Sequence, residues 1–135
     1  MNHHFSIDVH SFSMENLVRF VKNILKECLC SNDIISDIIL ILEELVTNII
    51  RHGNAPKIDL CFQISEDRIM VEVSDSGTYF DPLSYEVKGL DDAFADREIG
   101  GMGIYLVKEM TDELFYRYEN GKNILQCIKI IKQEN

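Results

Sequence analysis

The sequence lacks the patterns that mark several large classes of protein. None of its apolar runs reaches the roughly 18 residues that a membrane-spanning helix needs. Its first residues do not have the basic and then apolar layout of a secretory signal. We therefore expect a cytoplasmic protein with no membrane segment.

Basic residues are few and dispersed. The chain has 13 Lys and Arg against 23 Asp and Glu, a formal net charge of -10, and no block of basic residues. Nucleic-acid binding through counterion release needs a basic face, which this composition disfavours. The sequence therefore predicts no direct nucleic-acid partner, and it leaves a basic protein partner open.

The spacing of the cysteines predicts neither a disulfide framework nor a zinc site. The cysteines are Cys28, Cys30, Cys61 and Cys127, and the one close pair lies within a helical pattern. Two residues apart on a helix, those thiols diverge, so neither a zinc site nor a redox pair is expected. The four histidines are too scattered to form a metal cluster.

The spacing of the apolar residues predicts one α/β domain over residues 1–135. The 135 residues suffice to bury a continuous core. Strands are predicted over residues 5–10, 57–64, 68–74, 113–119 and 122–131. Helices are predicted from a cap at Ser11 or Ser13 to about residue 30, over 33–52 and from 100 onwards. The adjacent hairpins predict a two-layer α/β sandwich, in which three helices cover one face of a mainly antiparallel sheet of about five strands.

The helix predicted over residues 33–52 carries the first candidate site. Residues four apart on an α-helix lie about 40° from one another around the axis, so Glu44 and Asn48 project from one face. Asn48 falls at the edge of the apolar arc and Glu44 just outside it, where both can line a cleft. A carboxylate next to an amide oxygen suits a hydrated metal and phosphates. Taken alone, the pair is more typical of a polar helix edge, and His52 of a histidine favoured by the helix dipole.

A second candidate lies where the strand over residues 68–74 ends. Asp75 follows the strand, and Gly77 comes two residues later. A carboxylate there can accept a hydrogen bond from an exocyclic amine such as that of adenine, and a glycine lets a planar base approach the backbone. Taken alone, Asp, Ser and Gly are equally the residues of an ordinary turn, which is the more common outcome.

The third candidate is the glycine-rich start of the last helix. Gly100, Gly101, Met102, Gly103 and Ile104 would leave free N–H groups at a helix N-terminus, which favour phosphate. The segment is neither a dinucleotide fingerprint nor a P-loop, because no Lys-Ser or Lys-Thr follows and no strand immediately precedes it. A flexible hinge is the alternative.

In this order the three segments resemble the motifs of the Bergerat-type, or histidine-kinase-like, ATPase superfamily, whose members include gyrase, the mismatch-repair ATPases and histidine kinases. Residues 44–52, 75–77 and 100–103 look like its first, second and third boxes. Within the superfamily the chain resembles the bacterial anti-sigma-factor serine kinases over nearly its whole length, including Phe80-Asp81-Pro82 after the second box.

The resemblance implies a role for each matched residue. It implies that Asn48 holds Mg²⁺ and that Glu44 is the catalytic base. Asp75 would accept from the adenine amino group, with Gly77 giving room beside it. The other implied nucleotide-binding positions are His52, Gly100, Gly101, Met102, Gly103, Ile104 and Asn123, and residues 78–99 would form the ATP lid.

The function that the resemblance implies is transfer of the γ-phosphate of Mg-ATP to a serine of an anti-sigma-factor antagonist. A sigma factor is the second implied partner, Arg19 is the residue presented to partners, and a homodimer is possible. The chain departs from the family pattern at Tyr79, where glycine is common, and at Asn123, where a phosphate-binding threonine is common. Arg97 lies slightly upstream of the usual arginine position before Gly100.

Two other functions stay open. One is a binding module in which ATP or ADP sets the conformation of a partner-binding surface without phosphoryl transfer. The other is the catalytic fragment of a histidine kinase, which is disfavoured because the first helix occupies the space of the phosphoacceptor helices and no acceptor histidine motif is visible.

Overall fold

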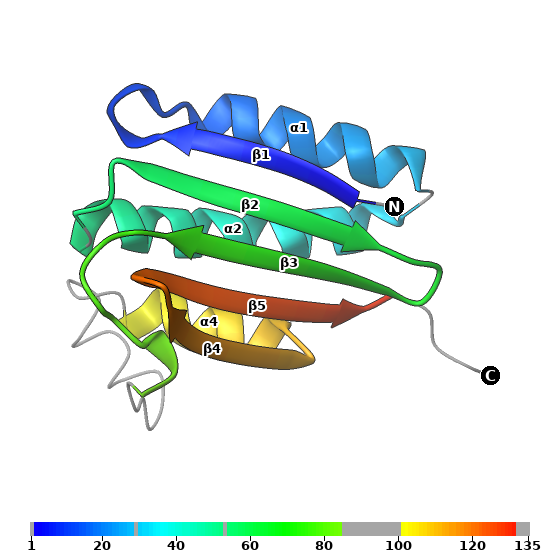
Figure 1. Cartoon of the computed structure of the whole chain (residues 1–135). Helices are drawn as coiled ribbons and strands as arrows, with labels where there is room; N and C mark the ends of the chain where they lie inside the picture. Colours follow the sequence, from blue (N-terminus) through cyan, green and yellow to red (C-terminus); the bar gives the residue numbers. More distant parts are fainter. Residues whose placement is uncertain (1, 29, 53, 85–100, 132–135) are drawn as a thin grey trace.

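The computed structural model describes residues 2–28, 30–52, 54–84 and 101–131, and it contains one five-stranded sheet (Figure 1). The strands lie in the order β1-β2-β3-β5-β4, and every neighbouring pair is antiparallel. Their bounds are β1 Asn2–Asp8, β2 Lys57–Ile64, β3 Arg68–Asp75, β4 Glu113–Glu119 and β5 Lys122–Ile130.

Three α-helices in the described part of the chain lie against one face of this sheet (Figure 1). They are α1 Met14–Glu27, α2 Asn32–His52 and α4 Gly101–Met110, and two short 3-10 helices span Val9–Ser11 and Pro82–Ser84. The predicted two-layer α/β sandwich is thus confirmed, with α4 packed against α2. None of the described helices is long and apolar enough to cross a bilayer.

Local sequence explains where the helices begin. The Ser13 hydroxyl caps α1 by accepting from the N–H of Asn16 at 3.3 Å. Ser31 does the same before α2, accepting from the N–H of Ile34 at 3.2 Å. Each cap satisfies one of the free donors at a helix start, which stabilises a helix by about 1 kcal/mol.

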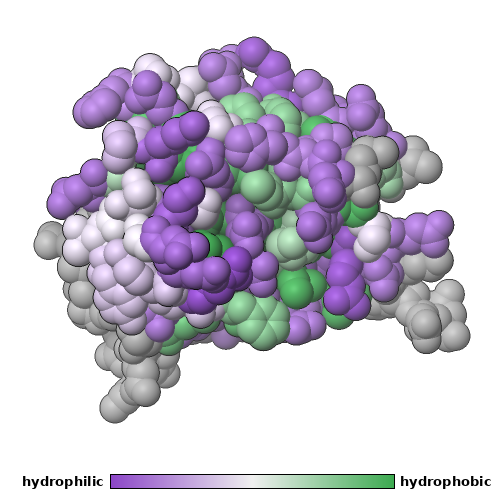
Figure 2. Space-filling model, viewed as in Figure 1, coloured by the Kyte–Doolittle hydropathy of each residue, from purple (hydrophilic) through white to green (hydrophobic). Residues whose placement is uncertain are grey.

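The core lies between the sheet and the helices. Alternate residues of β2 and β3 are buried, as the period-two pattern requires, among them Leu60, Phe62 and Val71. The opposite face of the sheet is open, and polar and apolar residues mix on it (Figure 2). There Glu72 accepts from Gln126 at 3.0 Å, so this face is held by polar contacts.

The first strand and the first helix differ from the sequence prediction. The strand covers Asn2–Asp8 and not residues 5–10, because Asn2 to His4 pair along β2 while the Asp8 carboxylate caps the following 3-10 turn at the N–H of His10. Helix α1 ends at Glu27 and not near Cys30. Most of the predicted lid, residues 85–99, and Gly100 lie outside the described residues.

Candidate nucleotide-binding site

A hollow opens between α2 and the ends of β3 and β5. The space within it, including the open mouth, is about 510 Å³. Its lining residues are Leu45, Asn48, Ile49, Val73, Asp75, Thr78, Phe80, Pro82, Tyr116, Asn123 and Leu125. The hollow therefore brings together members of the first and second predicted boxes.

Asp75 forms one end of the hollow. It is the last residue of β3 and is only 7% exposed. One carboxylate oxygen, Oδ1, accepts from the N–H of Gly77 at 2.8 Å and from Nδ2 of Asn123 at 3.2 Å. These two donors fix the carboxylate in a wall that is otherwise largely apolar, where one further donor such as an exocyclic amine can be recognised.

Glycine is the one residue type that fits at position 77 without a movement of neighbouring atoms. A Cβ built there would lie 2.9 Å from Oδ1 of Asp75, 3.2 Å from the backbone N of Ala55 and 3.3 Å from that of Asn54. The first distance is shorter than real Cβ contacts, and the other two atoms are backbone. A side chain would thus displace either the Asp75 carboxylate or the segment after α2.

Asn48 forms the other end of the hollow. Its Oδ1 atom is buried and has no hydrogen-bond partner among the described residues. An unpaired buried amide oxygen costs free energy, and oxygen atoms of this kind are the ligands that Mg²⁺ prefers. This oxygen therefore fits the ligand chemistry of a magnesium ion, and Asn48 is the residue that would hold one. Groups of three or more His, Cys, Asp or Glu with metal-site geometry are absent from the described residues.

Glu44 lies one helical turn before Asn48 and is half-buried. Burial raises the pKa of its carboxyl above the ordinary value of 4.5, the negative charge of Glu43 adds to the rise, and Arg51 opposes it. Glu44 shares a helical face with Asn48, but it is not among the residues that line the hollow.

The third box is described only in part. Helix α4 begins at Gly101, continues through Met102 and Gly103, and buries Ile104 against the core. Its start therefore coincides with the predicted phosphate-binding turn. The side chain of His52, the last residue of α2, lies outside the described features.

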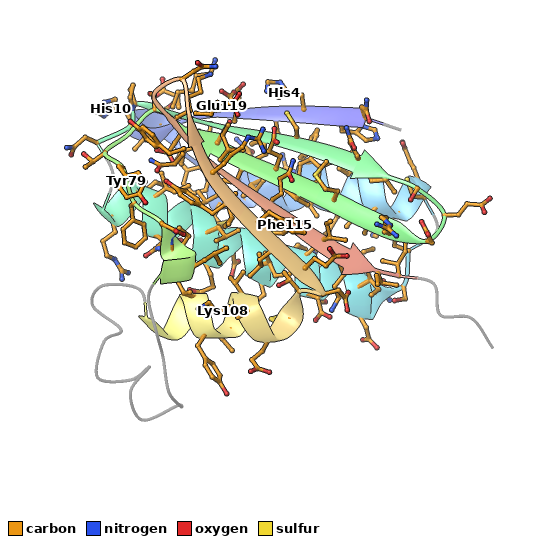
Figure 3. The ribbon with its side chains drawn as sticks, turned by 60° about the horizontal axis from the view of Figure 1, so that its bottom comes forward. His4, His10, Tyr79, Lys108, Phe115 and Glu119 are labelled. Atoms are coloured by element: carbon orange, nitrogen blue, oxygen red, sulfur yellow. The ribbon has the colours of Figure 1, made fainter. Side chains whose placement is uncertain are left out.

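Sequence reasoning missed Tyr116. Its hydroxyl donates to Oδ1 of Asn123 at 2.5 Å, and its ring lines the hollow. Tyr79, on the segment that follows β3, is 60% exposed (Figure 3). Its ring stands edge-on to those of Tyr116 and Tyr118, with centroid distances of 6.0 and 5.2 Å. The alternation of β4 was a usable signal, because it places Tyr116 on the same face as Leu114.

Arg19 is the predicted partner-binding residue. It lies on α1 and is well exposed, with its guanidinium 3.2 Å from the carboxylate of Glu15 one turn earlier. Such a surface pair is weak, so the arginine can exchange this contact for one to a partner.

The family model for the histidine kinase-like ATPase domain matches residues 10–129. The chain belongs to this family. Among its curated relatives is the serine-protein kinase RsbW of Staphylococcus epidermidis, 35% identical over 116 residues that cover 77% of this chain and 70% of the relative. The RsbW kinase of Staphylococcus aureus strain JH9 is 32% identical over 111 residues, 76% of this chain and 69% of the relative.

Solved structures show the same fold at low identity. The RsbU and RsbW domains of Rv1364c from Mycobacterium tuberculosis match with a TM-score of 0.69 and 14% identity, over 98% of this chain and 33% of that one. A chain of the SiaB–SiaC complex from Pseudomonas aeruginosa matches with a TM-score of 0.61 and 11% identity, over 96% and 89%. Both solved structures therefore share the fold of this chain.

Proposed function

We propose that the chain is a magnesium-dependent protein serine kinase of the anti-sigma-factor type. The observation that carries this proposal is the hollow with two complementary ends. Asp75 supplies a fixed acceptor for the adenine amino group, and Asn48 supplies an unpaired oxygen for a metal beside the phosphates. Family membership independently implies ATP binding.

The chemistry follows from the residues at the Asn48 end. Glu44 takes the proton of the acceptor serine hydroxyl while the serine oxygen bonds to the γ-phosphorus and the bond to the ADP oxygen breaks. Its raised pKa favours this proton transfer. The N–H groups at the start of α4 hold the phosphates. When bound through Asn48, Mg²⁺ supplies charge neutralisation at the phosphates.

The partners are the part of the proposal that rests on relatives. The RsbW relatives are serine-protein kinases, which supports a serine as the phosphate acceptor, and we propose that this serine lies on an anti-sigma-factor antagonist. We also propose a sigma factor that the protein sequesters, with Arg19 on α1 contacting partners, and a homodimer. The unit of function is one cytoplasmic ATPase domain over residues 1–135, whose lid spans about 78–99.

The test is incubation with γ-labelled ATP, Mg²⁺ and the small antagonist-like protein encoded nearest to this chain. We expect the label on one serine of that protein, and no label when the serine is replaced by alanine. Chelation of Mg²⁺ should stop the transfer. Failure to bind ATP would contradict the proposal at its root.

The result also separates the kinase from a nucleotide-dependent binding module. If ATP binds and changes partner affinity while no serine is ever labelled, the module is the function. Label on a histidine of this chain would instead identify a histidine-kinase fragment.

A further inference from the structure

Asn123 has used all of its hydrogen-bonding capacity within the protein. Its side chain is 8% exposed and stands opposite Asp75 in the register of β3 and β5. Its Nδ2 group donates to Oδ1 of Asp75 at 3.2 Å and to the carbonyl of Thr78 at 3.0 Å, with the carbonyl of Gly77 at 3.5 Å. An amide nitrogen has only two hydrogens, and both are committed.

The oxygen of the same amide is also fully engaged. Oδ1 of Asn123 accepts from the N–H of Phe80 at 3.0 Å and from the hydroxyl of Tyr116 at 2.5 Å. A carbonyl oxygen has two lone pairs, so neither side of the amide has a position left for a nucleotide. We call Asn123 with Asp75, Thr78, Phe80 and Tyr116 the Asn123 clasp.

We infer that Asn123 is a positioning residue for base recognition and not a direct nucleotide ligand. This inference rests on the proposed ATP site. The clasp ties the segment that follows β3 to strand β5 and holds Oδ1 of Asp75 from one side. We assign the other carboxylate oxygen of Asp75 as the acceptor for the 6-amino group of the base.

Tyr116 keeps the clasp in one protonation state. Burial, followed by the nearby Tyr79 and Asp81, raises the pKa of the Tyr116 hydroxyl to about 12. At neutral pH the hydroxyl is protonated, as an ordinary tyrosine also is, and it donates to Oδ1 of Asn123. The N–H of Phe80 can only donate and the carbonyl of Thr78 can only accept, so these two backbone groups fix which end of the Asn123 amide faces Asp75.

The test compares ADP with purine riboside diphosphate, which lacks only the 6-amino group. Affinities of the full chain for both ligands are measured by calorimetry for the wild type, Asn123→Ala and Tyr116→Phe, with Tyr118→Phe as the matched control. We expect the preference of the wild type for ADP to fall about tenfold in Asn123→Ala, the effect of one well-aligned hydrogen bond to a charged group. Tyr116→Phe should show a smaller fall in the same ratio, and Tyr118→Phe none.

The ratio separates positioning from a merely structural role. Partial unfolding of Asn123→Ala would lower both affinities equally and leave the ratio unchanged, which would overturn the inference. An equal fall in Tyr118→Phe would also overturn it. Binding of ADP with the expected ratios but without serine labelling would refute the kinase and leave the inference standing. A wild type that binds neither ligand would refute both.

Discussion

The polar atoms at the two ends of the hollow differ in their hydrogen bonding. At the Asp75 end the carboxylate and the Asn123 amide are held by partners within the chain. At the Asn48 end a buried oxygen has no partner among the described residues, and the neighbouring Glu44 has a raised pKa. In the proposed ATP site, the first end is held rigid before the ligand binds, whereas the second is completed by the metal and the phosphates.

We interpret this difference as two separate roles within the site, recognition of the base and binding of the metal and phosphates. A preorganised acceptor recognises a base by shape and by one hydrogen bond, so it can be fully assembled in the free protein. A metal ion and phosphates instead carry their own charges. A site for them leaves a buried polar atom unpaired in the free protein, which costs free energy until they bind. Substitutions at the two ends should therefore have different effects on catalysis, ligand affinity and stability.

The largest effect is expected from Glu44→Gln. Loss of the general base should lower kcat for serine phosphorylation by about 10²- to 10⁴-fold while leaving ATP affinity nearly unchanged. Glu43→Gln is the matched control, since it removes the adjacent carboxylate. In the wild type the acid limb of the pH-rate profile should lie above pH 4.5, because the active form is deprotonated and the pKa is raised. Equal loss in both variants would exclude Glu44 as the base.

Asp75→Asn tests the other end. Replacement of the carboxylate by an amide should weaken ATP binding by about 10- to 100-fold, as expected for loss of a hydrogen bond to a charged acceptor. Transfer at saturating ATP should stay close to the wild-type rate. Asp59→Asn on the open face of the sheet is the control, and calorimetric titration is the measurement. An unchanged affinity would remove Asp75 from the site.

A pair of matched substitutions compares the two ends directly. Asn48→Leu removes a buried oxygen without a partner, so we expect the free protein to become more stable by about 1 kcal/mol. Asn123→Leu removes an amide whose groups are all paired, so we expect a loss of about 1 to 3 kcal/mol. Urea unfolding without nucleotide measures both. If the two substitutions lowered the free energy of unfolding equally, the proposed difference between the two ends would be wrong.

The smallest effect concerns Tyr116. Its folded pKa of about 12 lies above the ordinary value of 10, so its contribution to stability is complete below pH 10 and is lost as the pH rises toward 12. The free energy of unfolding of the wild type should therefore fall more steeply over this window than that of Tyr116→Phe. Parallel curves for the two proteins would show that the hydroxyl does not titrate as expected.

Periodicity predicted the central hairpin well. The strands predicted over residues 57–64 and 68–74 correspond to β2 and to β3, which extends one residue further to Asp75. Each is buried on one face, which gives a clear period of two. The start of β1 was not predictable in this way, because residues 2–4 join the sheet through backbone pairing with β2.

The site was predictable as a set of motifs and not as a set of contacts. Helical spacing placed Glu44 and Asn48 on one face, and the structure brings Asn48 and Asp75 into one hollow. The role of Asn123 was hidden, because its partners at Asp75 and Phe80 lie 48 and 43 residues away in the sequence. Only the register of β3 with β5 brings them together.

The most direct measurement is binding of adenosine and of Mg-ATP to three forms of the protein. We expect Asp75→Asn to weaken both ligands by a similar factor, because both carry the base. Asn48→Ala should weaken Mg-ATP, lose the benefit of added Mg²⁺ and leave adenosine unchanged. Loss of adenosine binding in Asn48→Ala, or unchanged binding of both ligands in both variants, would contradict an ATP site with a base end and a metal end.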